Sequence, residues 1–268
     1  MRLGSASSLL APSLALLALT LPLRAQAEPE RRLQAQIEEL KRGQEQLRKD
    51  LAEIKALLQT RAETPAARMP PPTVSLNVHG EPFRGSALAR VAILEYSDFD
   101  CSYCARYAKE IYPLLDHAYV QAGKVKYFFR DLPGPEHPNA LFKARVARCA
   151  GEQDRFWEAH DRLFRDQRPF DGPGLAAFGQ ALGLEDAAFQ ACIGSDRYTE
   201  AIQRSADLAQ NMRINGTPAF LVGVLSDDGN VLRASKIFLG AESFEAFKAV
   251  LDELLKSAES SGKAAAKG

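Results

Sequence analysis

Cys101 and Cys104 are separated by two residues and lie between a short apolar segment and a segment with helical periodicity. The apolar segment, residues 91–96, predicts a buried strand, and residues 101–121 predict a helix. A cysteine at the start of a helix lies among backbone N–H groups that have no partner within the helix, at the positive end of the helix dipole. Both effects stabilise a thiolate, so the spacing and the placement together predict that Cys101 is a reactive thiol.

A zinc site and an inert structural bridge are the two alternatives for this cysteine pair. Zinc normally takes two further ligands at comparable spacing, but the sequence has no second Cys-x-x-Cys and no His-x-x-x-His. Redox chemistry is therefore the favoured interpretation, without a metal and without a cofactor. The four histidines show no metal-ligand arrangement and receive no role here: His79, His117, His137 and His160.

Three separated segments around the cysteines carry a resemblance to a known family. Residues 95–99 read Glu-Tyr-Ser-Asp-Phe, residues 148–164 hold Arg-Cys-Ala and then Phe-Trp-Glu-Ala-His, and residues 215–220 read Asn-Gly-Thr-Pro-Ala-Phe. In this order they resemble the DsbA-like branch of the thioredoxin superfamily, over roughly residues 75–257. The resemblance implies an α/β thioredoxin fold with a helical domain inserted at about 138–211, and thiol-disulfide oxidoreductase activity.

The resemblance also implies roles for single residues. Pro218 would follow a cis peptide bond opposite the cysteine pair, and the backbone of Thr217 would pair with an extended substrate peptide. Glu95 would be a buried acid that moves the proton of Cys104, with Lys126 as its partner. Without the resemblance, Pro218 is an ordinary proline at a strand start and Glu95 an exposed residue at a strand end.

Ser102 and Tyr103 separate the two cysteines and are expected to contact substrate. They differ from the Pro-His or Pro-Tyr dipeptides that are common in this family. The absence of proline removes a fixed φ at the helix start, and the absence of histidine removes a group that stabilises the thiolate. The redox potential therefore stays open.

Cys149 and Cys192 lie in the expected helical insertion, on separate helices. In an exported chain, pairing is the default, so a structural disulfide between them is predicted. Two buried thiols are the alternative.

The remaining pattern predicts an alternation of strands and helices. Strands are expected at residues 125–129, 219–225 and 231–239, and a last helix at 243–255. Pro113 is expected to kink the helix that follows the cysteine pair. Breaks in the helical insertion are expected at Pro169, at residues 172–174 and at Gly194.

The N-terminus resembles a secretory signal. Arg2 precedes an apolar stretch over residues 9–23, and residues 25–27, Ala-Gln-Ala, form a small-residue cleavage site, which defines a signal peptide of residues 1–27. An uncleaved anchor is the alternative, although the stretch is shorter than the roughly 20 residues that span a bilayer. Export into a periplasm follows, with exported cysteine-containing proteins as clients and a membrane redox partner that recycles the site.

Residues 28–61 predict a coiled coil. Apolar side chains alternate four and three apart, with one polar position: Leu33, Ile37, Leu40, Gln44, Leu47, Leu51, Ile54 and Leu58. Basic residues at the e positions favour a parallel homo-oligomer through residues 33–58, as a dimer or a trimer. A single helix packed on its own domain is the alternative. Residues 62–74 predict a Pro-rich linker and residues 258–268 a disordered tail.

Composition narrows the function further. The 268 residues hold 34 basic and 34 acidic side chains, so the net charge is zero and a nucleic-acid partner is not expected. The coiled coil, linker and DsbA-like domain are similar in plan to the DsbC and DsbG isomerases and to suppressor-of-copper-sensitivity proteins. The plan favours an isomerase or reductase. A dithiol oxidase, a Cu(I)-binding thiol protein and a scaffold with a vestigial site are the alternatives.

Overall fold

The computed structural model describes residues 21–63, 74–166 and 172–265. The chain divides into two compact units, Met1–Arg68 and Met69–Gly268, and each is described by itself. The first unit contains the helix α1 (Leu21–Glu63), which includes the whole of the predicted coiled-coil segment. The first 20 residues of the predicted signal peptide, and residues 64–73 of the predicted linker, lie outside the described residues.

The second unit is built on a mixed β-sheet with the strand order β1-β6-β5-β3-β4-β2. The strands are β1 (Val74–Asn77), β2 (Phe83–Arg84), β3 (Val91–Ser97), β4 (Val125–Asp131), β5 (Ala219–Leu225) and β6 (Val231–Leu239). The central strand β3 runs parallel to β4 and antiparallel to β5. The sequence predicted the four long strands correctly but not β1 and β2, which are short and lie at the two edges of the sheet.

Both faces of the central strand are buried, which explains its continuous apolar run. Val91 and Ile93 pack in one apolar cluster, beneath the helix α9 (Phe244–Ala265). Ala92 and Leu94 pack in another cluster on the opposite face. Because successive side chains of a strand point to opposite faces, Glu95 shares the face of Val91 and Ile93.

The helix predicted at residues 101–121 is divided in three. These parts are α2 (Ser102–Glu110), α3 (Tyr112–Leu115) and a π-helical turn, η1 (Asp116–Val120). The division falls just before Pro113, which lies in the first turn of α3. A proline has no N–H to donate and its ring crowds the preceding turn, so the first turn of a new helix tolerates it while a helix interior does not.

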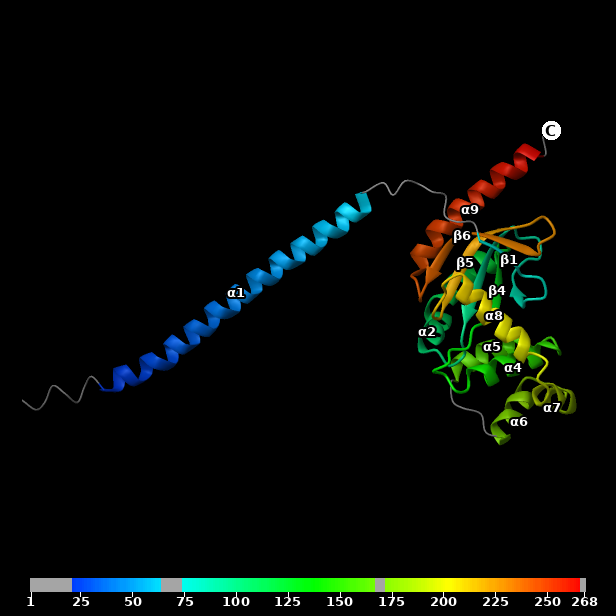
Figure 1. Ribbon diagram of the computed structural model, residues 1–268, viewed down its shortest axis with the longest axis horizontal. Helices are drawn as coiled ribbons and strands as arrows, with labels where there is room; N and C mark the ends of the chain where they lie inside the picture. Colours follow the sequence, from blue (N-terminus) through cyan, green and yellow to red (C-terminus); the bar gives the residue numbers. More distant parts are fainter. Residues whose placement is uncertain (1–20, 64–73, 167–171, 266–268) are drawn as a thin grey trace, which may run out of the picture. The chain divides into compact units, whose positions relative to one another are not determined.

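Helices that gather at one end of the second unit form the insertion (Figure 1). They are α4 (Ala140–Gly151), α5 (Phe156–Arg165), α6 (Gly172–Ala181), α7 (Asp186–Gly194) and α8 (Thr199–Asn211). The presence of a helical insertion is confirmed, and α7 ends at Gly194 as expected. Residues 172–174 do not break a helix but begin α6, because proline is compatible with a first turn. Pro169 lies outside the described residues.

The C-terminal helix is longer than the sequence pattern indicated. The prediction placed its end near Leu255 and a disordered tail at 258–268, whereas α9 continues to Ala265. The added segment mixes alanine, lysine and glutamate with three serines and a glycine, and it continues a helix that is already formed, which costs less than starting a new one.

Candidate functional site

The loop between β3 and α2 places the two cysteines. Cys101 is the residue before the first turn of α2, with an extended backbone (φ −73°, ψ 121°). Its N–H donates to the carbonyl of Asp98 (3.1 Å), and its carbonyl accepts the N–H of Ala105 (3.0 Å). Both cysteines are thiols, Cys101 with 5% of its surface exposed and Cys104 with none. Only Cys101 is therefore open to a reaction partner.

A cis peptide bond between Thr217 and Pro218 faces Cys101. Pro218 precedes β5, which lies directly beside β3, so the sheet brings this loop to the start of α2. In its protonated form the Cys101 thiol donates to the carbonyl of Thr217, with Sγ and the oxygen 3.4 Å apart. Residues that are more than a hundred positions apart in the chain thus meet at one point.

The pKa values of the two thiols are shifted in opposite directions. Hydrogen bonding from the Cys104 thiol, together with Thr217 and the backbone N–H groups of Cys104 and Tyr103, lowers the pKa of Cys101 to about 5 despite its burial. Burial raises the pKa of Cys104 far above its usual range, and its neighbours Cys101 and Glu95 add to this effect. At neutral pH, Cys101 is a thiolate and Cys104 is a protonated thiol.

The dipeptide between the cysteines is partly open to solvent. The Tyr103 side chain is 58% exposed, and the guanidinium of Arg106 lies 5.1 Å from the centre of its ring. Ser102, the first residue of α2, is also exposed. Both side chains are therefore accessible beside Cys101.

The buried acid Glu95 lies beneath the cysteine pair, with 2% of its surface exposed. Its Oε2 accepts a hydrogen bond from the hydroxyl of Tyr127 (2.7 Å). Burial raises the pKa of Glu95 to about 7, and the hydroxyls of Tyr127 and Ser97 oppose this rise only in part. A carboxyl group with this pKa exchanges protons near neutral pH.

Lys126, the expected partner of Glu95, does not fill that role. Its ammonium lies over the ring of Phe83, 3.9 Å from the ring centre. Lys126 pairs in register with Ala92, whose side chain points to the sheet face opposite Glu95. Tyr127, the next residue of β4, reaches Glu95 in its place.

Two ion pairs near Cys101 were not expected from the sequence. The buried Asp98 carboxylate accepts from the backbone N–H of Gly134 and pairs with the ring of His137, both at 2.7 Å. Hydrogen bonding with Asp98 raises the pKa of His137, and the Cys101 thiolate adds to the rise. Lys143, which is fully buried, pairs with Asp100 (2.5 Å).

Only the fold reveals these two pairs, because His137 and Lys143 come from the loop and helix that follow β4. Neither residue lies close in the sequence to the aspartate with which it pairs, so the sequence gave no signal of these pairs. In the structure, both are joined to aspartates that immediately precede the cysteine pair. They hold the β3–α2 loop against the insertion.

A family model described as Thioredoxin matches residues 77–253, more than half of the chain. The chain belongs to the thioredoxin family. The matched residues contain the whole sheet except part of β1, the cysteine pair and the cis-proline loop.

Individual proteins resemble parts of this thioredoxin-family chain. An Na(+)/H(+) antiporter, NhaA 3, of Salinispora tropica is 34% identical over 140 residues, which are 52% of this chain and 21% of the antiporter. Disulfide bond formation protein D of Bacillus subtilis is 24% identical over 161 residues, which are 54% of this chain and 69% of that protein. The chain thus spans about a fifth of the length of the first of these relatives.

Solved structures show the same fold. The crystal structure of α-DsbA1 from Wolbachia pipientis superposes with a TM-score of 0.60 at 22% identity, covering 69% of this chain and 96% of that one. The thioredoxin-family domain described here therefore has a DsbA-like architecture, in which helices are inserted into the thioredoxin fold.

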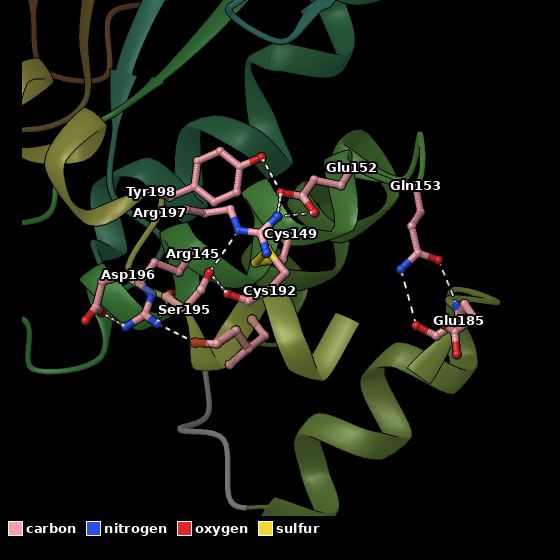
Figure 2. Close-up of a disulfide and its surroundings, with 11 residues drawn as sticks. Arg145, Cys149, Glu152, Gln153, Glu185, Cys192, Ser195, Asp196, Arg197 and Tyr198 are labelled. Carbon is pink, nitrogen blue, oxygen red and sulfur yellow. Dashed lines mark hydrogen bonds and ion pairs between the residues drawn. A yellow bond between two sulfur atoms is a disulfide. The ribbon is translucent and has the colours of Figure 1, made fainter. Parts of the chain in front are cut away.

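A disulfide joins two helices of the insertion (Figure 2). The sulfurs of Cys149, in α4, and Cys192, in α7, are bonded. Around them, the guanidinium of Arg145 donates to the carbonyls of Ile193 and Ser195 at the end of α7. The bond and these contacts attach α7 to α4, and both cysteines pack in the apolar cluster that also contains Cys101 and Cys104.

Further polar contacts surround this disulfide (Figure 2). Arg197 and Tyr198 both donate to the carboxylate of Glu152 at the end of α4. The side-chain amide of Gln153 and the backbone of Glu185 exchange two hydrogen bonds. These pairs join the end of α4 to the starts of α7 and α8.

A cavity of about 270 Å³ adjoins the cis-proline loop. Its walls are residues 132–136, residues 214–217, and Ala206 and Gln210 of α8. Across the loop, the exposed side chain of Leu239 precedes Gly240, whose N–H donates to the carbonyl of Pro218 (2.8 Å). An apolar and backbone-rich surface therefore continues from Thr217.

Two properties of the described part of the chain concern metals and membranes. Within residues 21–63, 74–166 and 172–265, no group of three His, Cys, Asp or Glu side chains is arranged to hold a metal ion. None of the helices described there has the length and apolarity that a membrane span requires.

The raised pKa of Glu95 predicts a pH dependence of stability. In the folded state the Glu95 carboxyl keeps its proton up to about pH 7, while in the unfolded state it loses the proton near pH 4.5. The free energy of unfolding therefore falls as the pH rises from about 4.5 to about 7. We expect a loss of roughly 2–3 kcal/mol between these limits, and its absence in Glu95→Gln.

Urea unfolding of the oxidised protein at several pH values measures this effect. The oxidised form is needed because the lowered pKa of the Cys101 thiol contributes the opposite trend in the reduced form, where stability is lost as pH falls. Equal pH slopes in the parent protein and Glu95→Gln would contradict the assignment.

Proposed function

We propose that this protein is a thiol-disulfide oxidoreductase that exchanges disulfides with exported proteins through Cys101 and Cys104. One observation carries the proposal: the Cys101 sulfur lies at the start of α2, with a lowered pKa, against the cis Thr217-Pro218 bond. A thiolate in such a position is the attacking species in disulfide exchange.

The steps of the exchange follow from the lowered pKa of Cys101 and the raised pKa of Cys104. The Cys101 thiolate attacks one sulfur of a client disulfide, forms a mixed disulfide and releases the other client sulfur as a thiolate. Cys104 then gives up its proton and attacks the Cys101 sulfur, which forms the Cys101–Cys104 disulfide and releases the second client thiolate. The client is reduced and the protein is oxidised by the same two electrons. The reverse sequence oxidises a client.

Client binding is assigned to the surface around the cis-proline loop. The backbone of Thr217 lies beside Cys101 and pairs with an extended peptide, as a strand pairs with a sheet edge. Ser102 and Tyr103 contact the client next to the reacting sulfurs, and the neighbouring cavity receives an adjacent side chain. Contacts to backbone favour many clients over one sequence.

The helix α1 supports the finer proposal of an isomerase or reductase that acts as an oligomer. Six large apolar side chains with the heptad spacing are 41–73% exposed: Leu33, Ile37, Leu40, Leu47, Leu51 and Ile54. An apolar stripe of this kind on one helix indicates a partner helix, and a second copy of the chain offers a matching stripe. We propose a parallel dimer or trimer through residues 33–58, with Gln44 setting the register.

Isomerisation uses the first half of the exchange. After Cys101 has opened a wrong disulfide, a different client thiolate attacks the mixed disulfide and releases Cys101 as a thiolate. No net electron transfer is needed. An oligomer that holds several such sites around one client favours this repeated attack over complete oxidation.

The proposed compartment is the periplasm. The signal-like residues 1–27 and the Cys149–Cys192 disulfide both support an oxidising location. A membrane redox partner would then restore the working oxidation state of Cys101 and Cys104.

A pair of protein forms tests the proposal. A chain that starts at Glu28 is compared with one that starts at Thr73, first in the reduction or oxidation of a model disulfide and then in the recovery of a scrambled-disulfide enzyme. We expect both forms to exchange disulfides and only the longer form to recover the scrambled enzyme. Recovery by both forms would remove the role of α1, and the absence of exchange in both would overturn the oxidoreductase itself.

The same comparison distinguishes the dithiol oxidase. If both forms oxidise a reduced client and neither recovers the scrambled enzyme, the protein is an oxidase and α1 serves another purpose. Sedimentation of both forms supplies the oligomeric state, for which we expect a monomer when residues 28–72 are removed.

A further inference from the structure

A chain of hydroxyl groups lies behind the buried acid of the proposed oxidoreductase. The hydroxyl of Tyr127 lies 2.7 Å from Oε2 of Glu95, and the hydroxyl of Tyr107 lies 3.0 Å from that of Tyr127. Tyr127 belongs to β4 and Tyr107 to α2, and both side chains are at most 1% exposed. The three groups therefore bond to one another without competition from solvent.

The hydrogen bonds among these three side chains all run toward the Glu95 carboxylate. Each tyrosine hydroxyl has one proton to donate, whereas an ionised carboxylate only accepts. Tyr127 therefore donates to Glu95, and Tyr107 donates to Tyr127, which uses both protons. The opposite direction would place a proton on Oε2 and leave the Tyr107 proton without an acceptor in the buried apolar cluster.

The other carboxyl oxygen, Oε1, is in a different situation. Within the described residues it is buried and has no well-formed hydrogen bond, and the same is true of the hydroxyl of Ser97. Ser97 interacts with both Glu95 and Cys104, and the charge of Glu95 acts on Cys104. Oε2 is thus occupied by the Tyr127 hydroxyl, and Oε1 is the carboxyl oxygen that has capacity to take up a further proton.

We propose that Tyr127, supported by Tyr107, is a positioning residue that orients the Glu95 carboxyl so that Oε1 exchanges the proton of Cys104. In the resolving step, the Cys104 S–H bond breaks and its proton moves to Oε1. The Cys104 sulfur bonds to Cys101, the bond from Cys101 to the client sulfur breaks, and the client leaves as a thiolate. Glu95 then returns its proton to solvent or to that thiolate.

This inference rests on the proposed oxidoreductase function and gives Glu95 a neutral partner. A lysine partner would hold the carboxylate ionised well below pH 7, whereas a hydroxyl stabilises it less strongly. The pKa of about 7 agrees with such a partner, since burial exceeds the effect of the Tyr127 hydrogen bond. The acid is thereby kept close to half-ionised at neutral pH.

Tyr127→Phe tests the inference, because it removes one hydroxyl and preserves the ring. The carboxylate loses its donor, so we expect the midpoint in the pH profile of mixed-disulfide resolution to move upward by about one pH unit. At pH 7 the ionised fraction then falls, and resolution slows about fivefold. Tyr107→Phe is expected to cause a smaller shift in the same direction.

Two variants serve as matched controls. Tyr119→Phe removes a hydroxyl from a tyrosine of the same apolar cluster, but this hydroxyl donates to the surface residue Asp252 (2.8 Å), so the profile should not move. Lys126→Gln should also leave it unchanged, because Lys126 lies on the opposite sheet face. A shift in Lys126→Gln as large as that in Tyr127→Phe would overturn the inference.

Titration of the Glu95 carboxyl carbon by NMR separates this inference from the proposed function. An upward shift of the Glu95 midpoint in Tyr127→Phe supports the orientation, whether or not clients are exchanged. An unchanged midpoint and an unchanged pH profile in a folded Tyr127→Phe would overturn it. If the parent protein exchanges no disulfide while the NMR shift is present, the function fails and the tyrosine contact stands.

Discussion

Replacing Cys101 by serine will abolish disulfide exchange. A serine oxygen forms no disulfide and is not ionised near neutral pH, whereas the Cys101 thiol has a pKa of about 5. We expect the rate of reduction of a model disulfide to fall at least about a thousandfold, to the background of the assay. The rate is measured under single-turnover conditions with the purified reduced protein.

Cys104→Ser provides the matched control. Cys101 remains able to attack, but the mixed disulfide has no resolving thiol, so a covalent complex with the client should accumulate. The complex is detected by mass spectrometry and is released by a small thiol. If Cys104→Ser is inactive without a trapped complex while Cys101→Ser traps one, the order of the two sulfurs is reversed.

Removing the disulfide of the insertion will have the largest effect on stability. The Cys149→Ala, Cys192→Ala double variant lacks a link that closes 43 residues of chain, and the lost restriction of the unfolded state corresponds to about 4 kcal/mol. Guanidinium unfolding of the parent and the double variant measures the difference. We expect a lower midpoint and a retained ability to exchange disulfides, because the thiols of Cys101 and Cys104 and the Thr217-Pro218 peptide bond remain in place.

Two comparisons sharpen this result. The Cys101→Ser, Cys104→Ser double variant keeps the Cys149–Cys192 bond and should remain close to the reduced parent in stability when both are unfolded at about pH 5, where the lowered pKa of Cys101 contributes little. A difference below about 0.5 kcal/mol between the parent and Cys149→Ala, Cys192→Ala would mean that contacts such as those of Arg145 and Glu152 already hold α7 and α8.

Local pattern was sufficient for much of the fold. The long strands are apolar runs bounded by turn residues, and the helices of the insertion show the period of an amphipathic helix, so periodicity located them. The short edge strands β1 and β2 escaped because two to four residues carry no period. The tail was misjudged for a different reason: low hydrophobicity suggested disorder, while α9, once formed, continues to Ala265 by propagation.

In the candidate site too, the local motifs could be predicted from the sequence, whereas a contact between strands could not. The spacing of Cys101 and Cys104 and the Thr217-Pro218 dipeptide were visible as motifs, and the resemblance supplied the position of Glu95. The partner of Glu95 was not visible. Lys126 and Tyr127 are neighbours in the sequence, and only the pairing of β3 with β4 decides which of them reaches the acid.

The sequence by itself therefore determined the reactive groups and the secondary structure that holds them, because helix starts, apolar periods and cysteine spacing are local properties. The tertiary structure alone decided the chemistry of those groups. Burial, the side of the sheet to which a residue points, and the charges brought in by distant loops set the acidities of Cys101, Cys104 and Glu95. These quantities depend on distances between residues far apart in the chain, and those distances exist only after the sheet has formed.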